Sequence, residues 1–258
     1  MIEVEYIDHM GDDLTVVNAA RVSFGKKSKY ECVDLIKGRW EVKTADKKLI
    51  WYLAEHDHKS PFNHAFATFH VKAPIFVARQ LQKHEYMTWN EISRRYVDSK
   101  PEFYEPEHWR GRSTDKKQGS SGVLELDKMY ACGEYEHIKD VFEKEPEKYG
   151  VYKDSLVPDL SILDEVHECD EYVISIYRKL IEAGVAPEQA RMVLPQSMMT
   201  EWYWSGSLYA FAKMCSLRTS SDAQYESKKV ASKISDTMLS LYPVSWNALR
   251  TTMYKGDE

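Results

Sequence analysis

The clearest hydrophobic pattern in the chain is a strict alternation over residues 64–74 (HAFATFHVKAP). One face of the predicted strand carries Ala65, Ala67, Phe69, Val71 and Ala73, and the other carries Phe66, Thr68, His70 and Lys72. Because successive side chains of a strand point to opposite faces, this pattern predicts a strand with one buried face. Residues 2–7 (IEVEYI) alternate in the same way and predict a second, half-buried strand.

The segment after the first strand is expected to form a small sheet edge. Residues 10–14 (MGDDL) predict a turn, and we interpret residues 16–24 (VVNAARVSF) as part of a second extended piece. Residues 46–57 instead have the spacing of a helix, which Ser60-Pro61 ends.

Helical patterns fill much of the remaining chain. Pro74 can begin a helix that carries Arg79 to His84, since the missing N–H of proline is harmless in a first turn. Further helices are predicted over residues 124–144, residues 163–184 with Gly184 as the C-cap, residues 186–195, and the aromatic residues 198–217 with Thr200 as the cap. The last helix is expected to begin at Ser221, where Gln224 completes a capping box, and to end at Leu241.

Size and composition place these elements in one domain. A chain of 258 residues, of which 43% are apolar, can bury one sizeable core. We therefore expect a single domain over residues 1–258 with an α+β fold, in which a small, mostly antiparallel sheet packs with a large helical portion. Residues 97–125 are polar and rich in Pro and Gly, and they predict a surface excursion that serves as a functional loop or lid.

Charge and cysteine content argue against several classes of protein. A formal net charge of −6 argues against binding to a nucleic acid polymer, although a local arginine cluster can still bind a small anion. The four cysteines lack CxxC spacing, which argues against a zinc site and for a reducing compartment. Since no basic leader or long apolar run is present, we expect a cytoplasmic protein without a signal peptide or a membrane span.

Residues 79–96 (RQLQKHEYMTWNEISRRY) concentrate cations beside polar side chains. On a helix, Arg79 and Lys83 share one face, and Gln80 and His84 share the next. The cluster is either a convergent anion site, completed by Ser93 and Arg95, or a solvated helix side. Glu91 forms either part of that site or a surface ion pair with Arg94 or Arg95.

Two further arginines are candidates for an anion site. Arg218 precedes a predicted helix N-terminus, where it can hold a phosphate or a polarised carbonyl oxygen, or lie solvated in a capping loop. Arg191 lies between apolar residues and is expected to need a paired anion. His56, Asp57 and His58 are a weak candidate for a metal site.

The chain resembles the flavin-dependent thymidylate synthases. The signature of that family is Arg-His-Arg, seven residues and Ser, and here Lys83-His84-Glu85 is followed by YMTWNEI and Ser93. Other segments match in the family order: AARVSF, SPFNHAFATFHVKAPIFVARQ, NEISRRY, EFYEPEHWR, KQGS, GVAPEQARMVLP, LRTSSDAQYE and YKGD. The resemblance implies a thymidylate synthase complementing protein-like fold, and it covers nearly the whole chain.

The resemblance also implies a reaction and a set of site residues. Methylenetetrahydrofolate would give a methylene group to dUMP, and FAD reduced by NADPH would supply the hydride. Arg218 and Ser93 would be catalytic, and the substrate would contact Arg79, Gln80, Glu91, Ser93, Arg94, Arg95, Arg191 and Arg218. The cofactor would contact Ser23, His58, Ser60, Asn63, Lys83, His84, Glu85, Ser207, Lys213 and Asp222. The family assembles as a homotetramer with shared active sites.

This chain departs from the family on the flavin side. Lys83 and Glu85 replace the two signature arginines, and Asp222 stands where the family commonly has histidine. A carboxylate near a flavin diphosphate repels it, so flavin is expected to bind through rearranged contacts, with Lys213 as compensation. Three alternatives follow: pyrimidine hydroxymethylation, a nucleotide-binding protein that has lost flavin, and a metal-dependent phosphohydrolase.

Overall fold

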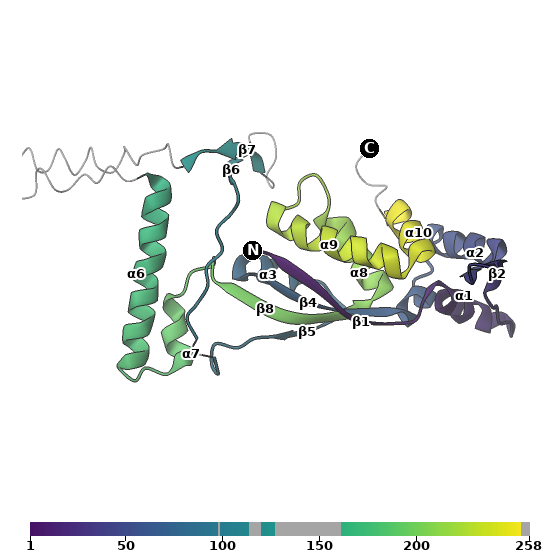
Figure 1. Ribbon diagram of the computed structural model, residues 1–258, viewed down its shortest axis with the longest axis horizontal. Helices are drawn as coiled ribbons and strands as arrows, with labels where there is room; N and C mark the ends of the chain where they lie inside the picture. The colour runs from purple at the N-terminus through teal and green to yellow at the C-terminus, as the bar shows by residue number, and fades with distance from the viewer. Residues whose placement is uncertain (98, 114–119, 127–160, 254–258) are drawn as a thin grey trace, which may run out of the picture. The chain divides into compact units, whose positions relative to one another are not determined.

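The computed structural model describes residues 1–97, 99–113, 120–126 and 161–253 (Figure 1). These residues form two compact units. The first unit takes residues 1–92 and the chain from residue 199 onward, and the second takes the described residues from 93 to 113 and from 120 to 198. The chain therefore leaves the first unit after residue 92 and returns to it at residue 199.

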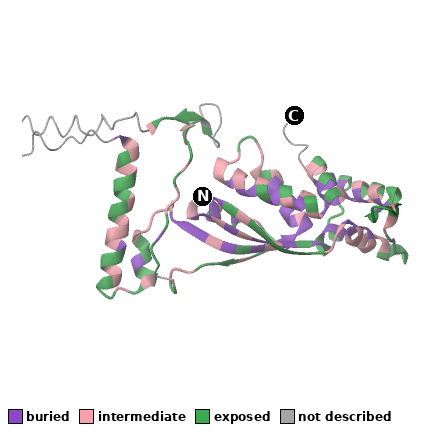
Figure 2. Ribbon diagram, viewed as in Figure 1, coloured by how far each residue is buried: buried purple, intermediate pink, exposed green. Residues whose placement is uncertain are grey.

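A four-stranded antiparallel sheet is the centre of the first unit. Its strands, in spatial order, are β1 (Glu3–Met10), β4 (Phe66–Pro74), β8 (Met199–Ser207) and β5 (Met87–Glu91). The strands predicted at residues 2–7 and 64–74 are confirmed, and so is the α+β class. The alternate residues from Ala65 to Ala73 are at most 1% exposed. Figure 2 shows buried residues along β4 and β8, which form the middle of the core.

Strand β8 corrects the prediction of a single buried helix over residues 198–217. Trp202 and Trp204 are both 1% exposed, and the exposed Tyr203 lies between them, which is the period of a strand. Trp202 also stacks on Trp89 of β5, with ring centroids 4.3 Å apart. Helix α8 (Leu208–Arg218) begins only after the strand, and Ser207 caps it instead of Thr200.

The prediction of an extended segment at residues 16–24 is wrong as well. Residues Asp13–Arg21 form helix α1, and Val22–Phe24 form the 3₁₀ turn η1. The Asp12 carboxylate accepts a hydrogen bond from the backbone N–H of Thr15 at 2.8 Å, and the Thr15 hydroxyl accepts one from the backbone N–H of Asp12 at 3.1 Å. This reciprocal capping begins the helix in spite of the β-branched residues that follow.

Three more helices cover the first unit. Helix α2 (Thr44–Glu55) confirms the helix predicted over residues 46–57. Helix α9 (Tyr225–Leu241) begins at Tyr225 rather than at Ser221, and its N-cap residue Gln224 makes no side-chain capping bond. Helix α10 (Pro243–Met253), which no pattern predicted, buries Trp246 and packs against α2, α8 and α9. In Figure 1, α8 and α9 lie over the same face of the sheet.

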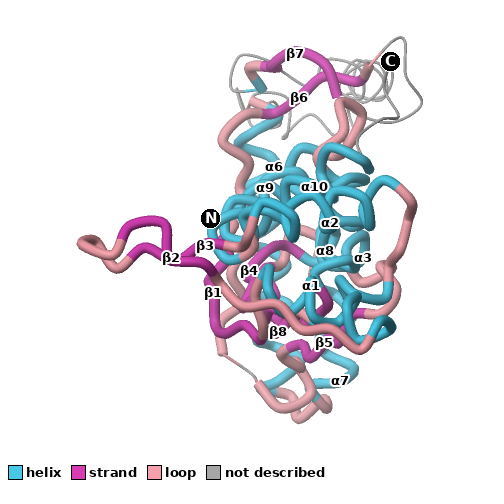
Figure 3. Tube along the Cα trace, turned by 90° about the vertical axis from the view of Figure 1, so that its right-hand side faces the viewer, coloured by secondary structure: helices cyan, strands magenta, loops and turns pink. Residues whose placement is uncertain are grey.

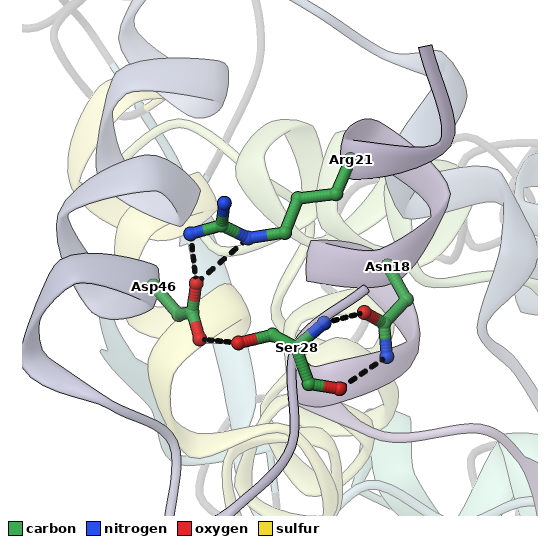
Figure 4. Close-up of polar contacts among 4 residues, drawn as sticks. All are labelled: Asn18, Arg21, Ser28 and Asp46. Atoms are coloured by element: carbon green, nitrogen blue, oxygen red, sulfur yellow. Dashed lines mark hydrogen bonds and ion pairs between the residues drawn. The ribbon is translucent and has the colours of Figure 1, made fainter. Parts of the chain in front are cut away.

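A buried polar cluster joins α1 to α2 (Figure 4). Asp46 is 0% exposed, and the Arg21 guanidinium donates to it through Nε at 2.9 Å and through Nη2. The Ser28 hydroxyl donates to the second carboxylate oxygen, and the Asn18 carboxamide pairs with the Ser28 backbone at 2.7 and 3.3 Å. A buried charge requires such partners, so the cluster fixes the loop after η1 against both helices.

The described residues between that loop and the sheet form short elements. Strands β2 (Glu31–Asp34) and β3 (Arg39–Glu41) pair as a hairpin that projects away from the helices in Figure 3. The 3₁₀ turn η2 (Ser60–His64) leads into β4. Along the described part of the chain, no helix combines the length and the hydropathy needed to span a membrane.

The second unit combines a strand pair with helices. Strand β6 (Trp109–Arg112) pairs with β7 (Ser120–Leu124). Helix α6 (Ile162–Glu182) confirms the helix predicted over residues 163–184, and Gly184 has φ +83° just after its end. The pattern at residues 186–195 gives only α7 (Pro187–Ala190) and the 3₁₀ turn η5 (Arg191–Val193). The helix predicted over residues 124–144 lies almost wholly outside the described residues.

Candidate active site

Helix α3 (Ile75–Leu81) leads into the signature segment. It begins after Pro74, as expected, but it ends at Leu81 with Gln82 as its C-cap. The prediction that this helix carries residues as far as His84 is therefore wrong. His84 lies in the turn that follows, where its backbone N–H donates to the Leu81 carbonyl at 3.1 Å.

Arg218 and His84, which are 134 residues apart in the sequence, meet in the first unit. Arg218 is the last residue of α8, and its Nε donates to Nε2 of His84 at 3.0 Å. Its Nη2 lies 3.5 Å from the backbone carbonyl oxygen of Gln80. Because a guanidinium only donates hydrogen bonds, Nε2 of His84 is the acceptor, and the neutral ring carries its proton on Nδ1. Two of the predicted clusters thus converge.

The surroundings of His84 keep its ring neutral. Burial lowers the pKa of His84 from 6.5 to about 4, and the positive charges of Arg218 and Lys213 act in the same direction. Burial also lowers the pKa of the Arg218 guanidinium. The pair consequently presents the charged donors of Arg218 and one neutral N–H of His84, a set that suits a carbonyl oxygen or an anion of a ligand.

Gln80 is anchored to helix α9. Its side-chain oxygen accepts a hydrogen bond from the hydroxyl of Ser227, which is 0% exposed. Arg218 contacts the backbone oxygen of the same glutamine. Helix α9 therefore fixes the residue against which Arg218 lies. The Gln80 carboxamide oxygen is thereby engaged, so any substrate contact expected of Gln80 falls to its amide nitrogen.

The carboxylate of Glu91, at the end of β5, is fixed by two donors. Oε1 accepts from the Thr200 hydroxyl at 2.6 Å, and Oε2 accepts from the Trp89 indole N–H at 3.1 Å. All three residues lie on the paired strands β5 and β8. These contacts fix the end of β5 shortly before Ser93.

The predicted nucleotide contacts Ser93, Arg94 and Arg95 belong to the second unit. Arg95 Nε donates to the Ser93 hydroxyl oxygen at 3.2 Å, and the Arg95 guanidinium lies 5.2 Å from the Tyr96 ring centroid. Arg94 donates to the backbone carbonyl of Ser99. The structure thus links the serine of the signature to one arginine of that segment.

The surroundings of Arg191, in the same unit, differ from those expected from the sequence. Its side chain is exposed on η5, and its Nε donates to the Glu188 carbonyl oxygen at 3.2 Å. The apolar neighbours do not bury it, because they form a tight 3₁₀ turn in which Met192 is 78% exposed. The prediction that Arg191 lies in a buried run is therefore wrong.

Three of the residues expected at a flavin, Ser60, Asn63 and Ser207, lie in η2 or at the start of α8. The Ser207 hydroxyl donates to the Asn63 side-chain oxygen at 2.7 Å. A cavity of about 190 Å³ lies close by, lined by Asp57, His58, Tyr209 and apolar residues of α2 and α10. Apart from His84, the remaining residues expected at the flavin have exposed side chains: Ser23, His58, Lys83, Glu85, Lys213 and Asp222. Arg79, which is expected at the substrate, is exposed as well.

Asp57, Lys59 and Tyr209 are joined by a hydrogen bond and an ion pair that the sequence analysis did not predict. The Tyr209 hydroxyl donates to Asp57 Oδ1 at 3.0 Å, and Lys59 Nζ lies 3.1 Å from Oδ2. Asp57 has φ +53°, which is uncommon for a residue other than glycine. The only sequence signal was the polar run at residues 55–60, and its connection to Tyr209 arises from the fold.

The histidines of that run have an aromatic partner. His56 and His58 stack with Tyr52, with ring centroids 4.0 and 6.0 Å from the tyrosine ring. In the ranges that the structure describes, no three His, Cys, Asp or Glu side chains are arranged to hold a metal ion. The metal interpretation of His56, Asp57 and His58 therefore gains no support.

Comparison with known proteins shows the class of enzyme. The model of the family described as thymidylate synthase complementing protein matches residues 5–244. The flavin-dependent thymidylate synthase of Thermosipho africanus is 36% identical over 251 residues, which cover 97% of this chain and 92% of that protein. A flavin-dependent thymidylate synthase of Thermus thermophilus is 37% identical over 253 residues, which cover 98% and 77%.

A solved structure gives the same result for the fold. The UMP/dUMP methylase PolB from Streptomyces cacaoi, bound with 5-Br dUMP, aligns with a TM-score of 0.72 and 27% identity, and the alignment covers 98% of this chain and 97% of that one. The chain is therefore a member of a class of methyl-transferring enzymes. More particularly, it belongs to the flavin-dependent thymidylate synthase family, as its resemblance predicts.

Proposed function

We propose that this chain carries out the reductive methylation of dUMP to dTMP, with methylenetetrahydrofolate as the carbon donor and NADPH-reduced FAD as the hydride source. The observation that carries the proposal is the Arg218–His84 pair beside Gln80. Fixed donors of this kind stabilise negative charge on a pyrimidine carbonyl oxygen as it develops. Arg218 is the residue to which we assign this role.

The donor set of the first unit fits a flavin. His84 offers its Nδ1–H, and the Asn63 carboxamide is held in one orientation by Ser207. These neutral groups suit the polar edge of a flavin ring, and when bound and reduced the flavin supplies the hydride. Lys83, Lys213 and Ser60 would serve its phosphates, against the charges of Glu85 and Asp222.

By the resemblance, we assign the phosphate of the nucleotide to Ser93, Arg95 and Arg191. Ser93 and Arg95 are already linked by a hydrogen bond of 3.2 Å, and Arg191 is exposed and able to meet a ligand with its outer guanidinium nitrogens. Arg–phosphate contacts are charge-assisted and therefore strong. By the resemblance we further propose a cytoplasmic homotetramer that binds small molecules only.

Flavin binding tests the proposal directly. The purified chain is titrated with FAD, with and without dUMP, and its visible spectrum and metal content are measured. Flavin absorbance that stays with the protein supports the methylase. Bound nucleotide without flavin would instead identify a nucleotide-binding homologue, and bound transition metal without flavin would support the phosphohydrolase. Either of these two results would contradict the proposal.

The Arg218 assignment needs matched variants. Arg218→Lys keeps the positive charge but loses the planar fork, and Arg39→Lys is the control, because Arg39 is an exposed arginine of the same unit that belongs to no predicted contact set. We expect Arg218→Lys to lose most of the turnover and Arg39→Lys to keep it. Equal losses in the two variants would contradict the assignment.

A further inference from the structure

Tyr86 combines a strained backbone with an almost fully exposed aromatic ring. Its φ is +62°, in the left-handed region that disfavours every residue with a Cβ, and its relative exposure is 88%. Glycine would occupy this position without strain, and a polar residue would suit its exposure. A bulky apolar ring gains neither packing nor backbone relief here, and strained residues of this type concentrate at ligand sites.

The turn that holds Tyr86 is anchored at both ends. On one side, His84 is bonded to the Leu81 carbonyl through its backbone and to Arg218 through its ring. On the other side, Met87 pairs with Gly206 in the sheet, and a Cβ at Gly206 would lie 3.1 Å from the Met87 side chain. Because the chain is fixed on both sides of Tyr86, its backbone conformation is imposed, and its exposed ring follows His84 by only two residues in the sequence.

We propose that the Tyr86 ring is a stacking surface for a planar heterocycle that binds at the Arg218–His84 pair, an inference that rests on the proposed function. Arg218 and His84 would hold the polar edge of such a ring, while Tyr86 covers its face. Stacking on an exposed aromatic side chain is a common way to bind nucleobases and related rings. The heterocycle is either the flavin ring or the uracil of the nucleotide, and binding measurements distinguish the two.

Three substitutions separate the ring from the strain. Tyr86→Phe keeps both, Tyr86→Ala removes the ring and keeps the strain, and Tyr86→Gly removes both. Tyr172 is the control, because it is 67% exposed on helix α6 with an ordinary helical backbone. We expect Tyr86→Gly to raise the melting temperature by roughly 1 to 3 °C, whereas Tyr172→Gly lowers it by a similar amount.

Ligand binding then decides the inference. FAD affinity is measured from flavin fluorescence, and dUMP affinity is measured by calorimetry. Tyr86→Ala and Tyr86→Gly should each weaken one ligand about tenfold, while Tyr86→Phe and Tyr172→Ala leave both unchanged. Weaker FAD binding assigns the ring to the flavin, and weaker dUMP binding assigns it to uracil.

The negative outcomes are distinct. If the wild-type chain binds FAD and dUMP and all Tyr86 variants bind both equally well, the stacking role is wrong while the proposed function stands. If the wild-type chain binds neither ligand, the proposed function fails and the stacking role fails with it.

Discussion

Replacing His84 with glutamine should flatten the dependence of stability on pH. The folded protein holds His84 neutral, with its pKa lowered from 6.5 to about 4, so between these values the unfolded chain binds more protons than the folded one. Stability from this source is complete above pH 6.5 and is lost as the pH falls towards 4. Glutamine does not titrate, and its side-chain oxygen can still accept from Arg218.

The size of the effect follows from the same shift. At about 1.36 kcal/mol per pKa unit, the full difference corresponds to roughly 3 kcal/mol. His84 is only partly buried, so solvent screening reduces this figure, and we expect about 1 to 2 kcal/mol. The free energy of unfolding is measured by urea denaturation of wild type and His84→Gln at several pH values between about 4 and 7. Parallel curves for the two proteins across this range would show that His84 does not titrate differently in the folded and unfolded states.

Three further predictions concern other parts of the molecule. Asp46→Asn leaves the Arg21 guanidinium without its anion, and it should lower the unfolding free energy in guanidinium chloride by about 3 kcal/mol or more; a change below about 1 kcal/mol would contradict the buried-pair account. Arg191→Ala should weaken dUMP binding in calorimetry by about 1.5 to 3 kcal/mol, and equal affinity would count against a phosphate contact. Light scattering should give the mass of a tetramer, and a monomer mass near 30.1 kDa would exclude shared active sites.

The sequence predicts elements well where one face is buried and the other is exposed. Strand β4 is such an element, since its apolar residues alternate without a break. Strand β8 is the opposite case: aromatic residues occupy both its faces, and a short apolar run does not distinguish a strand from a buried helix. The Trp202–Trp89 stack that decides the matter depends on a strand far away in the sequence.

The same reason limits what the sequence says about the site. Each signature segment can be found locally, but the Arg218–His84 bond joins two of them across the fold. The end of α3 at Leu81 changes which side chains share a face, and no local signal marks that end. Neither Asp57 nor Tyr209 lies in a motif that points to the other. Their hydrogen bond forms because the fold brings the start of α8 to the loop that holds Asp57.

Analysis of the reaction product tests whether the chain methylates dUMP. The chain is incubated with FAD, NADPH, methylenetetrahydrofolate and dUMP, with UMP in a parallel reaction, and the nucleotides are identified by mass spectrometry. We expect dUMP to gain one methyl group and Arg218→Lys to form far less of this product. A hydroxymethylated nucleotide, or unchanged dUMP in the presence of bound flavin, would contradict it.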